Sequence, residues 1–306
     1  MTLPLLLEQV LNGLQFGIML FLMAAGLTLV FGVMGLINLA HGSLYMVGAF
    51  ACAAVAAATG SFWLGLAASV VVAAFAGVLI ETLVMRHLYR RDHLDQVLAT
   101  FALILVFSEG TRWLFGSFPL YLNIPAALSS SITLPFGIVY PAYRMAIIVI
   151  GLVVAVGIFL LIHKTRLGIQ VRAGESDREM IGALGIDIAK LYTILFAIGA
   201  ALAGLAGALV GALQSVQVGM GEPVLILAFV VIVIGGIGSI KGALVGALIV
   251  GLTDTLGRTL LPVFFGTFME NASAMSVGAS LSSMLIYMVM AIILIVRPNG
   301  LFGTAH

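Results

Sequence analysis

The chain has 306 residues, of which 62% are hydrophobic and 8% are charged, with a formal net charge of +1. A soluble domain carries roughly 25% charged residues, which cover its surface. The mean hydropathy of +1.25 therefore excludes an ordinary soluble domain and predicts that lipid surrounds most of the chain. The near-zero net charge excludes a nucleic-acid partner, which would need a basic face. The single cysteine, Cys52, excludes an intrachain disulfide.

Apolar runs divide the chain into candidate membrane-spanning helices, each of which needs about 20 residues. In chain order the runs are approximately 10–30, 44–58, 63–85, 97–115, 145–162, 191–213, 224–240, 243–261 and 282–296. We predict an all-α, polytopic transmembrane helix bundle with about nine spans, formed by one domain over residues 1–306. Eight to ten spans are compatible with the sequence, because the short second run and the polar break at 32–42 also fit a re-entrant or broken helix.

Basic residues follow three of these runs, and basic residues gather on the cytoplasmic side of membrane proteins. The clusters are Arg86, His87, Arg90 and Arg91 after the third run, Lys164, Arg166, Arg172 and Arg178 after the fifth, and Arg297 after the last. Counting spans between the clusters gives the same orientation each time. The uncharged N-terminus is therefore predicted to lie outside and the C-terminus in the cytoplasm.

Small residues recur at helical spacing in two of the runs, a pattern that favours close helix packing in lipid. One stripe consists of Gly199, Ala203, Gly207 and Gly211, and the other of Gly238, Gly242 and Gly246. We interpret both stripes as scaffold contacts rather than as gating surfaces.

The longest polar stretch between the runs spans Thr165 to Lys190, within a predicted cytoplasmic loop at about 163–190, and it has the pattern of a short amphipathic helix. Ser176 followed by Glu179 forms a capping box, and Gly185 suits the left-handed position that ends a helix. The apolar residues between these signals are Met180, Ile181, Ala183 and Leu184. A helix this short needs a surface to cover its apolar side, either its own bundle or a partner.

Three blocks of sequence resemble known transporter motifs. The polar stretch, through Arg172, Ala173, Asp177, Ala183, Gly185 and Ile186, resembles the coupling loop of ABC importer permeases. Residues 37–42, Ile-Asn-Leu-Ala-His-Gly, and residues 297–303, Arg-Pro-Asn-Gly-Leu-Phe-Gly, resemble signatures of the branched-chain amino acid permease family, in the subunit type with Asn-Leu-Ala-His-Gly. Ser43 departs from the family pattern, which often has an acidic residue there.

The resemblance implies the permease subunit of an ATP-driven importer of branched-chain amino acids in a bacterial inner membrane. Its expected partners are a second, related permease, two cytoplasmic ATPases and a periplasmic solute-binding protein. ATP and Mg²⁺ would bind to the ATPases, because this chain has no Gly-x4-Gly-Lys-Ser/Thr motif, and we expect no cofactor in this chain. The residues expected to contact the ATPases are Arg172, Ala173, Ser176, Asp177, Glu179, Met180, Ile181, Leu184 and Gly185.

Broken helices often line the passage of a transporter, and two glycine-rich breaks occur here. We assign them to the translocation path or gate: Asn38, His41 and Gly42 in the first, and Gly235, Gly236 and Gly238 in the second. Turn stabilisation is the alternative role for Asn38 and His41.

Charged residues inside the apolar runs occur in neighbouring pairs of opposite sign. The pairs Glu109 with Arg112 and Asp254 with Arg258 favour structural neutralisation over a substrate role. Glu81, near the inner end of the third run, is expected to turn toward the Arg86 cluster. The chain shows no nucleophile elbow, no paired histidines at metal-binding spacing and no clustered carboxylates, so we expect transport rather than catalysis, and no metal site.

Three other functions remain open from the sequence. The same family architecture would also suit import of urea, amides or another small solute. An ATP-independent secondary transporter or channel would be expected to place an isolated ionisable residue at mid-membrane. A purely structural membrane subunit would show no transport defect when its bundle is altered.

Overall fold

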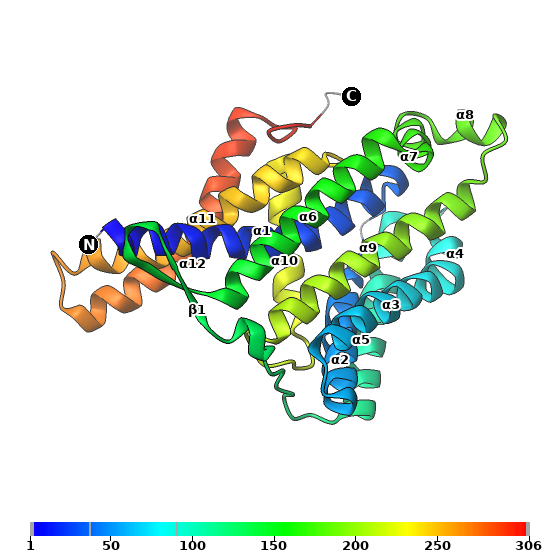
Figure 1. Cartoon of the computed structure of the whole chain (residues 1–306). Helices are drawn as coiled ribbons and strands as arrows, with labels where there is room; N and C mark the ends of the chain where they lie inside the picture. Colours follow the sequence, from blue (N-terminus) through cyan, green and yellow to red (C-terminus); the bar gives the residue numbers. More distant parts are fainter. Residues whose placement is uncertain (1–2, 37, 90, 304–306) are drawn as a thin grey trace. The chain divides into compact units, whose positions relative to one another are not determined.

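The computed structural model describes residues 3–36, 38–89 and 91–303 (Figure 1). It describes the backbone but not the side chains of Phe136, Arg178 and Glu179. Ile37 of the first motif block and Arg90 of the first basic cluster lie outside the described residues.

Helices make up most of the described chain, and eight of them are long and apolar enough to cross a membrane. The long helices are α1 (Leu3–Met34), α2 (His41–Thr59), α3 (Phe62–Ile80), α5 (His93–Phe115), α6 (Ala142–Lys164), α9 (Ile188–Gly211), α11 (Ile240–Phe265) and α12 (Asn271–Val296). The third of these continues through a π-helical segment, η1 (Glu81–Met85), into α4 (Arg86–Leu88). The shorter helices are α7 (Arg166–Ser176), α8 (Arg178–Ala183) and α10 (Gly221–Gly235).

The helix count agrees with the lower end of the predicted range. The seventh apolar run corresponds to α10, whose 15 residues are fewer than the roughly 20 that a straight span needs. The second run forms α2, which has 19 residues and is long enough to span. The structure also contains a small hairpin that the all-α prediction lacks, in which β1 (Ser131–Leu134) pairs antiparallel with β2 (Ile138–Pro141). Two short 3₁₀ turns, η2 (Ala126–Leu128) and η3 (Pro135–Gly137), flank β1.

The described helices belong to two compact units. The first unit comprises residues 1–21, 126–152 and 229–306, and the second comprises residues 22–125 and 153–228. Helices α1, α6 and α10 each contribute residues to both units.

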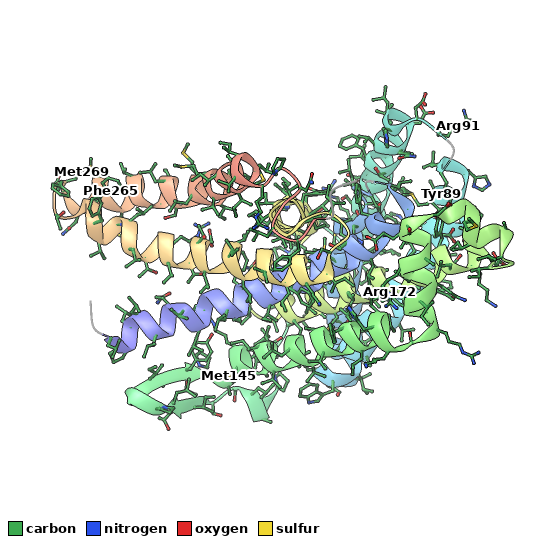
Figure 2. The ribbon with its side chains drawn as sticks, turned by 90° about the horizontal axis from the view of Figure 1, so that it is seen from above. Tyr89, Arg91, Met145, Arg172, Phe265 and Met269 are labelled. Atoms are coloured by element: carbon green, nitrogen blue, oxygen red, sulfur yellow. The ribbon has the colours of Figure 1, made fainter. Side chains whose placement is uncertain are left out.

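In the first unit, the start of α1 runs antiparallel to α11. A Cβ atom added at Gly13 would lie 2.9 Å from Leu252 Cδ2, and one added at Gly17 would lie 2.8 Å from the Ala247 carbonyl oxygen. Helix α12 returns along α11, with Gly278 against Pro262. Figure 2 marks Phe265 and Met269 at the turn that joins these two helices.

The β hairpin lies at the same end of the first unit as the start of α1. The Tyr140 hydroxyl and Arg144 Nη1 both donate to Asn12 Oδ1, at 3.3 Å and 2.6 Å. Burial raises the pKa of Tyr140 to about 12, so its hydroxyl keeps its proton at neutral pH.

In the second unit, α9 packs closely against α1, α2 and α3. A Cβ atom added at Gly26 of α1 would lie 2.6 Å from the Gly199 carbonyl oxygen, and one added at Gly48 of α2 would overlap the Gly204 backbone. A Cβ atom added at Gly204 would also lie 2.8 Å from the Ser69 carbonyl oxygen of α3. These contacts require small residues, because a larger side chain would separate the helix backbones.

The predicted glycine stripes differ in how well they match the structure. Gly199 and Gly207 of the first stripe lie against the backbones of Gly26 and Tyr45. In the second stripe, Gly242 and Gly246 pack against α10, but Gly238 does not belong to the helix. Ser239 ends the turn and caps α11, because its Oγ accepts a hydrogen bond of 3.0 Å from Gly242 N.

Candidate functional site

The polar stretch between α6 and α9 folds into two helices rather than one. Thr165 caps α7, with its Oγ1 accepting a hydrogen bond of 3.2 Å from Gly168 N. Asp177 then adopts an extended conformation, with φ −155° and ψ 101°, and separates α7 from α8. Figure 1 shows α8 following α7, at the point where the chain turns into α9.

The predicted capping box is wrong by one residue. Ser176 is the last residue of α7, and Asp177 caps α8, because its Oδ1 accepts a hydrogen bond of 2.9 Å from Met180 N. Asp is as good an N-cap as Ser, and its extended backbone suits that position. Counting from Asp177, Met180 takes the third helical position and Glu179 the second, so the Ser176–Glu179 pair is out of register for a capping box.

Helix α8 ends as its sequence predicts. Gly185 has φ +86°, a left-handed conformation that glycine adopts without a steric cost. Ile186 N donates to the Ile181 carbonyl oxygen at 3.2 Å, and Gly185 N donates to the Gly182 carbonyl oxygen at 3.0 Å. This is the hydrogen-bond pattern of a Schellman motif, which satisfies the last carbonyls of a helix.

The apolar residues of α8 divide between two surfaces. Ile181 is buried against Gly174 of α7, close to Val33. A Cβ atom added at Gly174 would lie 3.2 Å from Ile181 Cδ1 and 3.3 Å from Val33 Cγ1. By contrast, Met180 is 58% exposed and Leu184 is 73% exposed. Ile181 therefore fixes α8 to its own unit, and Met180 and Leu184 are left as an exposed apolar surface.

The other predicted loop residues lie on α7 and at its end. Arg172 Nη1 donates to the Ile162 carbonyl oxygen, which ties α7 to the last turn of α6. Arg172, Ser176 and Asp177 are exposed, and Ala173 is partly exposed.

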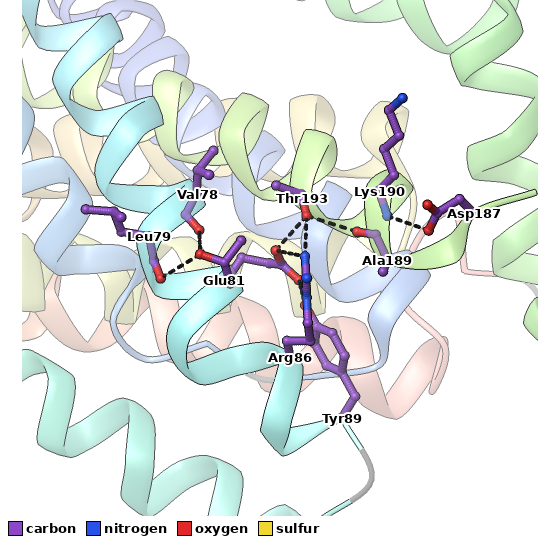
Figure 3. Close-up of polar contacts among 10 residues, drawn as sticks. Val78, Leu79, Glu81, Arg86, Tyr89, Asp187, Ala189, Lys190 and Thr193 are labelled. Carbon is purple, nitrogen blue, oxygen red and sulfur yellow. Dashed lines mark hydrogen bonds and ion pairs between the residues drawn. The ribbon is translucent and has the colours of Figure 1, made fainter.

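A buried carboxylate joins three segments of the second unit (Figure 3). The Glu81 side chain is 0% exposed. Its Oε1 accepts from the Tyr89 hydroxyl at 3.0 Å, and its Oε2 accepts from Arg86 Nη2 at 3.1 Å and from the Thr193 hydroxyl at 2.6 Å. The prediction that Glu81 turns toward the Arg86 cluster is confirmed, but its bonds to Thr193 and Tyr89 were not predicted.

The π-helical segment explains why Arg86 reaches Glu81. A π-helix pairs residues five apart, and Arg86 N donates to the Glu81 carbonyl oxygen. The extra residue in the turn brings the Arg86 side chain back over the Glu81 carboxylate. Burial and the negative charge of Glu81 raise the pKa of Tyr89, so its hydroxyl remains a donor. The Arg86 side chain is 43% exposed, so solvent screens its half of the ion pair.

The first predicted break lies in the interior of the second unit. Asn38 and His41 are both fully buried. Asn38 Oδ1 accepts from Ala40 N at 3.0 Å, which closes the turn before α2 and supports the turn-stabilising role of Asn38. His41 lies beside the C-terminal half of α1, since a Cβ atom added at Gly26 would lie 3.0 Å from its Nε2. A Cβ atom added at Gly42 would lie 2.9 Å from the Gly221 carbonyl oxygen.

The second predicted break meets the C-terminal motif block, a contact that the sequence did not reveal. Leu301 N and Phe302 N donate to the carbonyl oxygens of Ile234 and Gly235, each at 2.9 Å. The block therefore satisfies carbonyls at the end of α10. Gly236 has φ +98°, and a Cβ atom added there would lie 2.8 Å from Gly303 Cα. Gly238 also has a positive φ, of +81°.

Both predicted charge pairs are within bonding distance. Arg112 Nη1 lies 2.5 Å from Glu109 Oε1, and both side chains are largely exposed. Arg258 Nε donates to both oxygens of Asp254, at 2.9 Å and 3.0 Å, and Asp254 is 8% exposed. Among the residues that the structure describes, no three His, Cys, Asp or Glu side chains lie together as a metal site requires.

The long apolar helices define a multi-pass membrane protein. The family described as branched-chain amino acid transport system / permease component matches residues 9–294. This chain belongs to that family.

Three relatives illustrate the similarity. The chain is 29% identical over 313 residues to the high-affinity branched-chain amino acid transport system permease protein BraD of Pseudomonas aeruginosa, covering 97% of this chain and 95% of that protein. It is 28% identical over 326 residues to the corresponding LivH protein of Escherichia coli, with the same coverage. It is 29% identical over 299 residues to a probable branched-chain amino acid transport permease protein LivH of Methanocaldococcus jannaschii, covering 93% of this chain and 89% of that protein. No solved structure matches the chain.

Replacing Gly236 with alanine should release the C-terminal block. The new side chain would be strained at φ +98° and would press on Gly303 and Asn299. Backbone strain of this kind costs about 1–3 kcal/mol. We expect a lower melting temperature in detergent and faster proteolysis of a C-terminal tag. The matched control is Gly157→Ala on α6, where an added Cβ meets nothing within 4 Å. Equal melting temperatures and equal proteolysis for the two variants would contradict the assigned contact.

Proposed function

We propose that this chain is a permease subunit of an ATP-driven ABC importer that translocates branched-chain amino acids. The observation that supports this proposal most is the exposed apolar surface of α8, formed by Met180 and Leu184. The chain that presents it matches the permease family over residues 9–294. Helix α8 is capped at both ends and anchored by Ile181, so the surface is presented in a fixed conformation. Such a surface suits the groove of a soluble partner that accepts a short helix.

The proposed partners are the subunits that would bind ATP, complete the membrane channel and deliver the substrate in such an importer. Two cytoplasmic ATPases bind ATP and Mg²⁺ and contact α8. A second, related permease completes the membrane channel, and a periplasmic solute-binding protein delivers the amino acid. Apolar side chains such as those of leucine, isoleucine and valine would pass a channel that has few charges. The complex is proposed to lie in the bacterial inner membrane.

We further propose that the N-terminus lies outside and the C-terminus in the cytoplasm. In the first unit, the start of α1, the β hairpin and the end of α11 lie at one end, as the contacts of Asn12 and Gly13 indicate. The C-terminal block lies at the opposite end, beside the turn between α10 and α11. This arrangement supports opposite sides for the two termini, and the basic residues assign the C-terminal side to the cytoplasm.

Single cysteines should report this orientation in a Cys52→Ala background. Ser130→Cys and Ser273→Cys, both at exposed positions, should react with an impermeant thiol reagent in intact cells. Ser176→Cys, exposed at the end of α7, should react only after the cells are opened. Labelling of Ser176→Cys in intact cells would reverse the proposed orientation.

Replacing Leu184 with aspartate should weaken the binding of the ATPases to α8. A charge placed in the covered apolar contact costs roughly 2 kcal/mol, which weakens binding about thirtyfold. We expect loss of ATPase co-purification and of leucine uptake, with the permease still inserted, because Leu184 is 73% exposed and lies outside the long apolar helices.

Leu184→Met is the matched control, because it keeps an apolar side chain of similar volume, and it should behave like the wild type. Normal ATPase recovery and normal uptake with Leu184→Asp would remove α8 from the interface. Uptake that needs no ATPase in the wild type would instead favour a secondary transporter or channel. ATP-driven uptake of urea or an amide, without uptake of leucine, would change the proposed substrate.

A further inference from the structure

The first turns of α9 connect α8 to the buried Glu81 cluster. Asp187 Oδ1 accepts a hydrogen bond of 3.0 Å from Lys190 N and so caps α9 directly after the turn that ends α8. A Cβ atom added at Gly182 of α8 would lie 3.0 Å from Ile188 Cδ1. Since α8 packs on the first turn of α9, a displacement of α8 moves the start of α9 with it.

Thr193 lies in the second turn of α9 and bonds to Glu81 of η1, the π-helical segment that continues α3. Its hydroxyl lies 2.6 Å from Glu81 Oε2 and 2.9 Å from the Ala189 carbonyl oxygen. A hydroxyl has one proton to donate, and the carboxylate is the stronger acceptor. When the contact with Glu81 breaks, the same proton can be donated to Ala189 within the helix. The hydrogen bond between α9 and η1 can therefore break without leaving a donor unpaired.

The carboxylate also keeps its other donors when this hydrogen bond breaks. Arg86 and Tyr89 both follow Glu81 on the same continuous helix, and both bond to it (Figure 3). Only Thr193 joins Glu81 from α9, and Arg86 Nη2 also donates to the Thr193 hydroxyl at 3.1 Å. When the contacts with Thr193 break, Arg86 and Tyr89 still pair the buried negative charge of Glu81. The break therefore does not leave an unpaired buried charge, which would be costly.

A pocket lies next to the hydrogen bond between Thr193 and Glu81. A pocket of about 420 Å³ opens between α4 and the first turns of α9. Its lining residues are Arg86, His87, Tyr89, Ile188, Ala189 and Tyr192. The pocket leaves part of the surface between α4 and α9 unfilled, beside the edge contact of the Tyr89 and Tyr192 rings, whose centroids lie 5.0 Å apart. The start of α9 is therefore less tightly packed here than where helix backbones touch.

We propose that the hydrogen bond between Thr193 and Glu81 transmits movement of α8 into η1, the segment that continues α3, which makes these two residues positioning residues for transport. The proposal rests on the proposed function, because it assumes that ATPases act on α8. Thr193 alternates between Glu81 and Ala189 as α9 moves, and the π-helical segment at Glu81 receives the displacement. Segments of π-helix inside α-helices are frequent at functional sites.

The test compares threonine variants in the complete complex, reconstituted in proteoliposomes with the solute-binding protein and leucine. Thr193→Val removes the hydroxyl and keeps the shape of the side chain. Thr193→Ser keeps the hydroxyl. Thr82→Val is the matched control, because Thr82 is also half-buried and its hydroxyl bonds only to its own helix, at Val78 and Leu79.

We expect Thr193→Val to retain its ATPases and to hydrolyse ATP when the loaded binding protein is present. Leucine uptake should fall at least tenfold, so that the ATP consumed per leucine rises by the same factor. Thr193→Ser and Thr82→Val should show the wild-type ratio. A ratio unchanged in Thr193→Val would overturn the proposal, including the case in which uptake falls only because less complex is recovered.

The outcomes also separate this proposal from the proposed function. Loss of the ATPases from Thr193→Val would overturn the transmission role, because the bond would then only maintain the docking surface. If Leu184→Asp loses its ATPases while Thr193→Val keeps a normal ratio, the proposed function stands and the transmission role fails. A wild-type complex that neither binds ATPases nor responds to ATP would overturn both.

Discussion

The close contact between α9 and its neighbours is the constraint on which the second unit depends. At Gly199 and Gly204 the backbones of α1, α2 and α3 approach α9 very closely. A Cβ atom added at either glycine would overlap, or nearly overlap, atoms of the neighbouring helices. Lipid provides no hydrophobic drive between helices, so such close packing must supply much of the association energy. These contacts hold the middle of α9, whereas α8 packs on its first turn, at Ile188. The proposed movement of α8 therefore acts on the part of α9 that precedes the close contacts.

Backbone polar groups set the second constraint, since a lipid environment offers them no water. At the break before α2, the Asn38 side chain accepts from Ala40 N. At the end of α10, the C-terminal block donates to the carbonyls of Ile234 and Gly235. The two motif blocks that resemble family signatures thus each satisfy backbone groups at a helix end or turn in this fold. A role for either break in the translocation path remains a proposal.

The sequence predicted the helices well, because apolar runs of sufficient length have few alternatives in lipid. It also placed the end of α8 at Gly185, where a left-handed residue is required. The start of α8 was misplaced, since Ser176 and Asp177 cap a helix equally well and only the fold decides between them. Contacts between distant segments, such as Thr193 with Glu81, have no signature in a single sequence. The burial of Ile181 beside an exposed Leu184 depends on which face α7 covers.

We propose that this chain moves branched-chain amino acids across the membrane, driven by ATP that partner subunits hydrolyse. The most direct measurement is uptake of labelled leucine into proteoliposomes that contain this chain, its related permease and the ATPases, with the solute-binding protein added on the other side. We expect leucine to accumulate above its external concentration. This accumulation should require ATP and the binding protein, and isoleucine and valine should reduce it. Leucine that merely equilibrates across the membrane, with or without ATP, would contradict it.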